Sequence, residues 1–115
     1  MRAPDVELLW WEGCPSTERA LADLRHVLRA AGLDPASVRM REIHSEADAA
    51  AAAFVGSPTI RIDGADVVPS PEDEPVGLTC RVYRRRDGRI SPTPDPDDVL
   101  EALRRAAKPP KEADK

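Results

Sequence analysis

The order of the first three predicted elements constrains the fold of this chain more than any other feature. Residues 5–11 begin with alternating side chains and end in an apolar run, a pattern typical of a buried strand. Residues 16–31 place apolar side chains three and four positions apart, which predicts a helix, and residues 37–43 alternate as a strand with one exposed side does. A strand, a helix and a second strand in succession require a parallel pair with a right-handed crossover. The chain has 115 residues, enough for one hydrophobic core, so we predict a single small α/β domain.

The remaining patterns extend this unit to a β-α-β-α-β-β-α order. Ser45 has the position of an N-cap for a short helix that continues through residues 49–53. Residues 59–62 and 65–68 flank an Asp-Gly pair, which predicts a tight β-hairpin. Asp95 is the predicted cap of the last helix, because a proline and two acidic residues follow it.

Residues 69–94 form a predicted insertion between the hairpin and the last helix. The insertion begins as a proline-rich, acidic loop, and residues 78–85 alternate in a way that predicts one further strand. We predict that residues 1–108 form the single domain. Residues 109–115 hold two prolines and four charged residues, which predicts a disordered tail.

Composition excludes several classes of protein. The net charge of −4 and the aromatic content of 3% argue against binding of nucleic acid through basic patches and stacked rings. The longest apolar stretch, residues 49–55, is far shorter than the ~20 residues of a membrane-spanning helix. No hydrophobic leader precedes residue 5, so we predict a cytoplasmic protein with neither a nucleic-acid nor a membrane partner. Fourteen of the seventeen basic residues are arginine, a bias that indicates a GC-rich genome.

The cysteine and histidine content restricts the chemistry. The chain has two cysteines and two histidines, none at close metal-ligand spacing, so we predict no zinc site. In a cytoplasmic protein, two cysteines are typically reactive, metal-binding or buried rather than joined in a structural disulfide. Cys14 and Cys80 are therefore the candidate reactive groups.

Two local motifs carry a resemblance to a known family. Residues 11–17 (WEGCPST) resemble the Gly-Cys-Pro-x-Cys loop between the first strand and the first helix of glutaredoxins. Residues 56–59 (GSPT) resemble the cis-proline loop that precedes the hairpin of thioredoxin-like proteins. With the flanking elements, the resemblance covers residues 5–68 and about 95–107. It implies a thioredoxin-like fold of the glutaredoxin branch, with residues 69–94 as an insertion.

The resemblance assigns roles to residues of both motifs. It implies that Cys14 is the nucleophile and that Pro58 follows a cis peptide bond. The backbone of Ser57 and Thr59 would then hold a substrate strand. Thr17 stands where a dithiol glutaredoxin has its second cysteine, so the usual Cys-x-x-Cys disulfide cannot form.

Cys80 is the other thiol of the chain and lies in the insertion. In the fold that the resemblance implies, strand 65–68 returns to the end of the sheet that holds Cys14, and the insertion begins there. We therefore predict that Cys80 approaches Cys14 and acts as a resolving thiol. Residues 77–83 (GLTCRVY) also resemble a late segment of small bacterial thioredoxin-like proteins that are sometimes named alkylmercury-lyase-like.

The surroundings of Cys14 favour a reactive thiolate. Cys14 precedes the predicted helix, whose free N–H groups and positive dipole end attract an anion. Ser16 or Thr17 can donate a hydroxyl hydrogen bond to the thiolate, whereas the carboxylate of Glu12 opposes the anion. The Gly-Cys-Pro turn is expected to expose the thiol. Arg81, in the insertion, has two interpretations, a partner for a thiolate or a solvated side chain on a strand.

The aromatic side chains of the first strand complete the predicted site. Trp10 and Trp11 are neighbours on a strand and therefore point to opposite faces. We assign one of them to the core and Trp11 to the wall of the substrate groove.

Three functions fit these residues. In the first, the protein is a thiol–disulfide oxidoreductase that acts on a protein or small-molecule disulfide. Cys14 attacks, and Cys80 or glutathione, the candidate reductant, resolves the intermediate without a bound cofactor. In the second, both thiolates bind a soft metal or an organomercurial, and Glu12 delivers a proton. In the third, the fold is a non-catalytic binding module, in which a one-cysteine site shared by two chains can hold an iron–sulfur cluster. The first function is our prediction, and the oligomeric state stays open.

Overall fold

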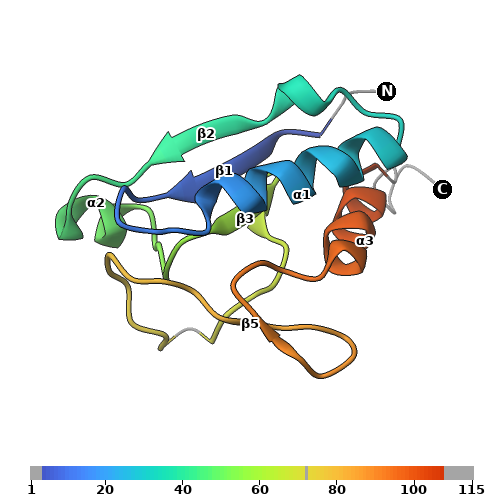
Figure 1. The fold of residues 1–115 in the computed structure, drawn as a ribbon. Coiled ribbons are helices and arrows are strands. Elements are labelled where there is room, and N and C mark those ends of the chain that lie inside the picture. The colour runs from blue at the N-terminus through green and yellow to red at the C-terminus, as the bar shows by residue number, and fades with distance from the viewer. Residues whose placement is uncertain (1–3, 72, 108–115) are drawn as a thin grey trace, which may run out of the picture.

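A four-stranded mixed sheet runs through the centre of the protein in the order β2-β1-β3-β4 (Figure 1). Strands β1 (Val6–Trp10) and β2 (Arg39–Glu42) are parallel, and helix α1 (Thr17–Ala30) connects them. Strand β3 (Thr59–Ile62) pairs antiparallel with β1, and β4 (Ala65–Asp66) returns antiparallel to β3 through the predicted hairpin. These elements confirm the predicted mixed α/β class. The structure is a computed structural model that describes residues 4–71 and 73–107.

Helices cover both faces of the sheet. Helix α3 (Pro96–Ala107) packs against α1 over one face, and the six-residue helix α2 (Glu46–Ala51) lies over part of the other. This division follows from the alternation along β1, because Leu8 points into the core under α1 and α3 while Leu9 points into the core beside α2. A short 3₁₀ turn (Pro35–Ser37) leads into β2.

Each face of the sheet has its own hydrophobic core. The larger core comprises Val6, Leu8, Ala20, Leu24, Val27, Leu28, Ile60, Ile62, Val67, Val99, Ala102 and Leu103. The smaller core comprises Leu9, Ile43, Ala49, Ala52 and Phe54. Phe54 is fully buried, and its backbone carbonyl accepts the N–H of Gly77 from the insertion at 3.1 Å. The smaller core therefore supports both α2 and the start of the segment that carries Cys80.

Strand β2 is more exposed than its sequence pattern predicts. The alternation places Met40 on a buried side, but its side chain is 42% exposed. The prediction of one exposed side is wrong because β2 is the edge strand of the sheet, and the larger core under α1 and α3 ends at its neighbour β1. Both faces of β2 are consequently open along most of the strand.

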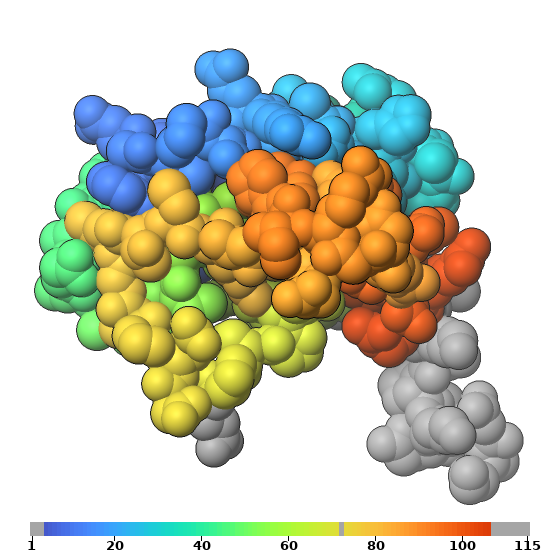
Figure 2. All heavy atoms as spheres, turned by 60° about the horizontal axis from the view of Figure 1, so that its bottom comes forward, coloured from blue at the N-terminus to red at the C-terminus, as the bar shows by residue number. Residues whose placement is uncertain are grey.

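The insertion, yellow to orange in Figure 2, lies over one face of the protein beside the blue N-terminal segment. Its regular structure is a two-stranded sheet of β5 (Tyr83–Arg84) and β6 (Ile90–Ser91). The predicted strand over residues 78–85 is thus confirmed only near its end. Before β5, Cys80 instead forms an isolated parallel bridge with Ser57. This segment pairs with the loop in front of β3.

The N-terminus of α3 is capped by Asp95, as predicted. Its two carboxylate oxygens accept the backbone N–H groups of Asp97 and Arg86, each at 2.9 Å. These hydrogen bonds, first that of Arg86, hold the pKa of Asp95 below its ordinary value. Asp95 therefore fixes the helix and also the hairpin that leads into it.

Replacing Asp95 with alanine should lower the free energy of unfolding by about 1 kcal/mol at neutral pH. Because its pKa is depressed in the folded state, this stabilisation is present above the ordinary pKa of ~3.9 and is lost as the pH falls through the folded value. Urea titrations at neutral pH and at successively lower pH should show the difference between variant and wild type shrink as the pH falls below ~3.9. A difference that stays constant over this range would contradict the account.

Within the described part of the chain, no helix combines the length and the apolar character that a membrane crossing requires. The predicted tail, residues 109–115, lies outside the described residues.

Candidate functional site

The backbone of Ser57 is the point where three segments of the candidate site meet. Its N–H donates to the carbonyl of Thr79 at 2.8 Å, and its carbonyl accepts the N–H of Arg81, also at 2.8 Å. The same carbonyl accepts the thiol of Cys14 at 3.6 Å. Cys80 therefore lies between two residues that are both hydrogen-bonded to Ser57, the residue that also accepts the Cys14 thiol. The resemblance assigns the Ser57 backbone to the binding of a substrate strand, but its N–H and carbonyl form hydrogen bonds within the chain.

Cys14 is buried, which corrects the prediction that its turn exposes it. The turn itself is present, since the Cys14 N–H donates to the Trp11 carbonyl at 3.1 Å just before α1. The residue is nevertheless only 7% exposed. The sequence of the turn could not reveal this burial, because the groups next to the Cys14 sulfur are the Ser57 carbonyl and the Cys80 thiol, which lie far along the chain.

Cys80 is exposed and lies close to Cys14. Partial burial raises the pKa of the Cys80 thiol, and the neighbouring Cys14, through the charge of its thiolate and its hydrogen bonding, raises it further. Both cysteines are free thiols in this structure. The structure therefore brings the two candidate reactive groups together, although they lie far apart in the sequence.

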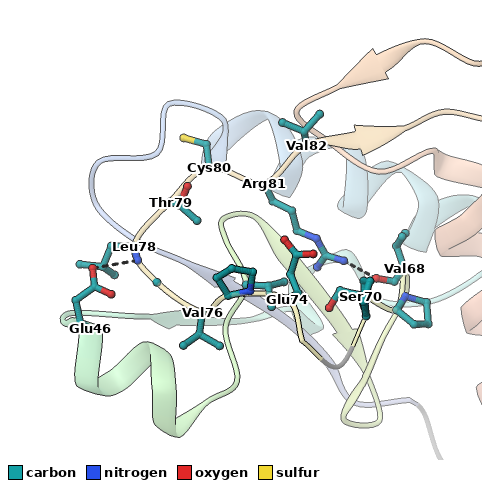
Figure 3. Close-up of a pocket in the computed structure, with 15 residues that line it drawn as sticks. Glu46, Val68, Ser70, Glu74, Val76, Leu78, Thr79, Cys80, Arg81 and Val82 are labelled. Carbon is teal, nitrogen blue, oxygen red and sulfur yellow. Dashed lines mark hydrogen bonds between the residues drawn. The ribbon is translucent and has the colours of Figure 1, made fainter.

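Arg81 fits neither interpretation that the sequence suggested. Figure 3 shows its guanidinium group pointing away from the Cys80 sulfur, toward Val68. The side chain is 9% exposed and pairs with the carboxylate of Asp66 at 2.7 Å. It also donates to the Thr59 hydroxyl at 3.1 Å and to the Val68 carbonyl. Arg81 is therefore a buried anchor of the segment, neither a partner of a thiolate nor a solvated side chain.

The ring of Tyr83 completes this anchor. The Arg81 guanidinium lies 4.7 Å from the ring centroid, and the phenol donates a hydrogen bond to the Pro58 carbonyl. Burial raises the pKa of Tyr83 well above its ordinary value, so the phenol remains a donor. The peptide bond between Ser57 and Pro58 is cis, as predicted. Thr59 is fully buried, and its hydroxyl donates to the Gly56 carbonyl at 2.6 Å.

Gly56 allows the insertion to lie this close to the loop. Its φ of 139° is one that side-chain-bearing residues rarely adopt, and a Cβ there would lie 3.1 Å from the Cβ of Arg81. Sequence reasoning used this glycine only as part of the loop motif of residues 56–59. Its second role depends on a contact with Arg81, twenty-five residues further along.

Trp11 connects the segment that carries Cys80 to the loop before α1 through a hydrogen bond. Its indole N–H donates to the Thr79 carbonyl at 3.0 Å, so this carbonyl accepts two hydrogen bonds. The ring lies over Gly13, where a Cβ would come within 2.3 Å of it. Trp11 also lines a cavity of about 430 Å³ together with Glu12, Gly13, Glu42, Ile43, His44 and Leu78.

Thr17 supports the loop in a different way from the one expected. Its hydroxyl donates to the backbone carbonyl of Cys14 at 3.4 Å and not to the sulfur. The predicted hydrogen bond from Thr17 to a Cys14 thiolate is therefore absent in this conformation.

A cavity of about 740 Å³ lies inside the curve of the insertion (Figure 3). Its wall includes Val55 from the loop after α2, Val68 just before the insertion, and Cys80. Glu46, at the start of α2, accepts the N–H of Leu78 at 3.5 Å and so joins the helix to the same segment. The exposed thiol thus borders a cavity large enough for a small molecule or a side chain.

Replacing Trp11 with phenylalanine should loosen the segment over Cys14. The variant loses one hydrogen bond of about 1 kcal/mol, so the opened population, and with it the rate at which iodoacetamide modifies Cys14, should rise about fivefold. Trp10→Phe is the matched control, because the Trp10 indole N–H is buried and has no hydrogen-bond partner in the described residues. Equal rates in the two variants, measured by peptide mass, would remove Trp11 from this role.

Among the described residues, no three His, Cys, Asp or Glu side chains are grouped closely enough to hold a metal ion. Comparisons of the chain with protein-family models, with curated proteins and with solved structures each gave no match.

Proposed function

We propose that this protein is a thiol–disulfide oxidoreductase of thioredoxin-like fold in which Cys14 and Cys80 form the redox pair. The observation that carries the proposal is the proximity of two free thiols on segments that are both hydrogen-bonded to the Ser57 backbone. A structural role needs no such exposed thiol, because the segment is already anchored through Arg81 and Trp11.

The topology supports the fold assignment within this proposal. The sheet order β2-β1-β3-β4, with a parallel β-α-β unit followed by an antiparallel hairpin, is the one that the resemblance implies. Cys14 lies directly before α1, and Pro58 lies directly before β3. These two positions support the thioredoxin-like assignment.

The proposed reaction is a two-electron exchange. A substrate disulfide accepts two electrons and two protons from the Cys14 and Cys80 thiols and leaves as two thiols, while the pair forms one internal disulfide. Glutathione is the candidate reductant that restores the pair. The substrate class is a disulfide of a protein or a small molecule.

A single-turnover reaction tests this function. Fully reduced protein, freed of reductant, is mixed with oxidised glutathione, and the remaining protein thiols and the released glutathione are counted. We expect two thiols lost and two glutathione molecules released per chain, because the pair resolves its own mixed disulfide. A stable adduct that retains one glutathione per chain, or no loss of thiols, would refute the two-thiol reaction.

Binding of a soft metal ion is a second candidate, favoured by the same contact. Two adjacent thiolates are ligands that such ions select, and the described residues place no third carboxylate or imidazole with them. Addition of one equivalent of Hg²⁺ to the reduced protein should then protect both cysteines from alkylation. Protection of neither would exclude this candidate without affecting the redox proposal.

A further inference from the structure

We infer that Cys80, and not Cys14, is the thiol that first attacks the substrate, with Cys14 acting second as the resolving thiol. This inference rests on the proposed redox pair and reverses the order that the sequence motif implies. It concerns the sequence of events at the site, which the formation of an internal disulfide alone does not determine.

Access is the first argument. Cys14 is 7% exposed, whereas Cys80 is exposed. Figure 3 shows the Cys80 sulfur projecting away from the segment, and Cys80 is one of the residues that line the cavity. A disulfide from solution therefore meets the Cys80 sulfur before it can reach Cys14.

The hydrogen bonds around Cys14 are the second argument. A disulfide can reach the Cys14 sulfur only if the segment that carries Cys80 moves away from it. That movement breaks the two bonds to Ser57 and the indole bond to the Thr79 carbonyl. The Cys14 thiol also donates to the Ser57 carbonyl, and a thiolate cannot make this bond. Attack by Cys80 requires none of these losses.

The protonation of Cys80 does not reverse this order. Its raised pKa lowers the thiolate fraction at neutral pH, so its reaction should accelerate as the pH rises through the ordinary thiol range. Access therefore decides which of the two thiols reacts first.

The chemistry balances in two steps. The Cys80 thiolate attacks one sulfur of the substrate R–S–S–R′, a Cys80–S bond forms, and R′S⁻ leaves and takes up a proton. The Cys14 sulfur, which lies close to Cys80, then attacks the Cys80 sulfur as its own proton is lost. RS⁻ leaves and is protonated, and the Cys14–Cys80 disulfide remains. The substrate is reduced and the pair is oxidised by two electrons.

Limited alkylation of the reduced wild-type protein tests the order. With iodoacetamide well below one equivalent, peptide mass should find the label on Cys80 at least about tenfold more often than on Cys14. Labelling of Cys14 first would overturn the inference. The wild type is used here because both thiols then compete for the reagent within one molecule.

Two variants test the order in the disulfide reaction. Cys14→Ser should form a lasting mixed disulfide with oxidised glutathione at Cys80, because no thiol is left to resolve it. Cys80→Ser should form its adduct at Cys14 at least about tenfold more slowly. An equal or faster reaction of Cys80→Ser overturns the inference.

The inference and the proposed function fail in different ways. If Cys14 is labelled first and the internal disulfide still forms in single turnover, the order is wrong and the redox pair stands. If Cys80 is labelled first and no internal disulfide forms, the proposed function fails and the inference falls with it.

Discussion

Replacement of either cysteine with serine should abolish repeated turnover of a disulfide substrate. In the wild type, the second thiol lies against the first, and such a fixed arrangement makes the resolving step intramolecular. Each single variant must instead wait for a thiol from solution. We expect the steady-state rate of disulfide reduction to fall about 100-fold or more in both variants.

The rate is measured as reduction of a model disulfide with glutathione as the electron source. Met40→Leu is the control, because Met40 also carries sulfur but is 42% exposed on the edge strand β2. It should retain the wild-type rate. Full activity of Cys80→Ser would show that a single thiol is sufficient and would exclude the insertion from the reaction.

Loss of the Arg81 side chain should produce the largest change in stability. Arg81→Met leaves the carboxylate of Asp66, which is 19% exposed, without its cation. Removal of one partner from a buried ion pair costs about 3 kcal/mol or more. The variant also loses the bonds to Thr59 and Val68, so the free energy of unfolding in urea should fall by at least that amount.

Arg86→Met is the matched control for this experiment. Arg86 also contacts two carboxylates, those of Asp98 and Glu101, at 2.8 and 3.1 Å, but all three side chains are largely or partly exposed. Exposed ion pairs contribute little to stability, so this variant should be nearly as stable as the wild type. The double variant Arg81→Met with Asp66→Leu should recover part of the loss. An equal loss of unfolding free energy in Arg81→Met and Arg86→Met would contradict the role of Arg81 as a buried anchor.

The element order could be predicted from the sequence because local signals specify it. The helix caps at Ser45 and Asp95 and the hairpin turn before Ala65 depend on residues a few positions apart, and all three are present. The cis peptide bond before Pro58 was likewise predicted from a local motif. Short-range chemistry of this kind survives in almost any tertiary surroundings.

The candidate site was less predictable because long-range packing decides it. The burial of Cys14 depends on a segment from the insertion, and no pattern near residue 14 encodes that cover. The burial of Arg81 depends on Asp66, which lies on β4. One signal was available in the sequence. If Cys80 on an extended segment faces Cys14, its neighbour Arg81 must face the opposite way, into the protein.

The position of the disulfide in the oxidised protein tests the central claim most directly. Trypsin should release Cys14 within residues 3–19 and Cys80 within residues 62–81, since cleavage follows arginine. After mild oxidation and blocking of free thiols, the account predicts one disulfide-linked pair of these two peptides from a monomeric chain. If both peptides instead appear separately, each blocked as a free thiol or oxidised on its own, the two cysteines do not form a redox pair.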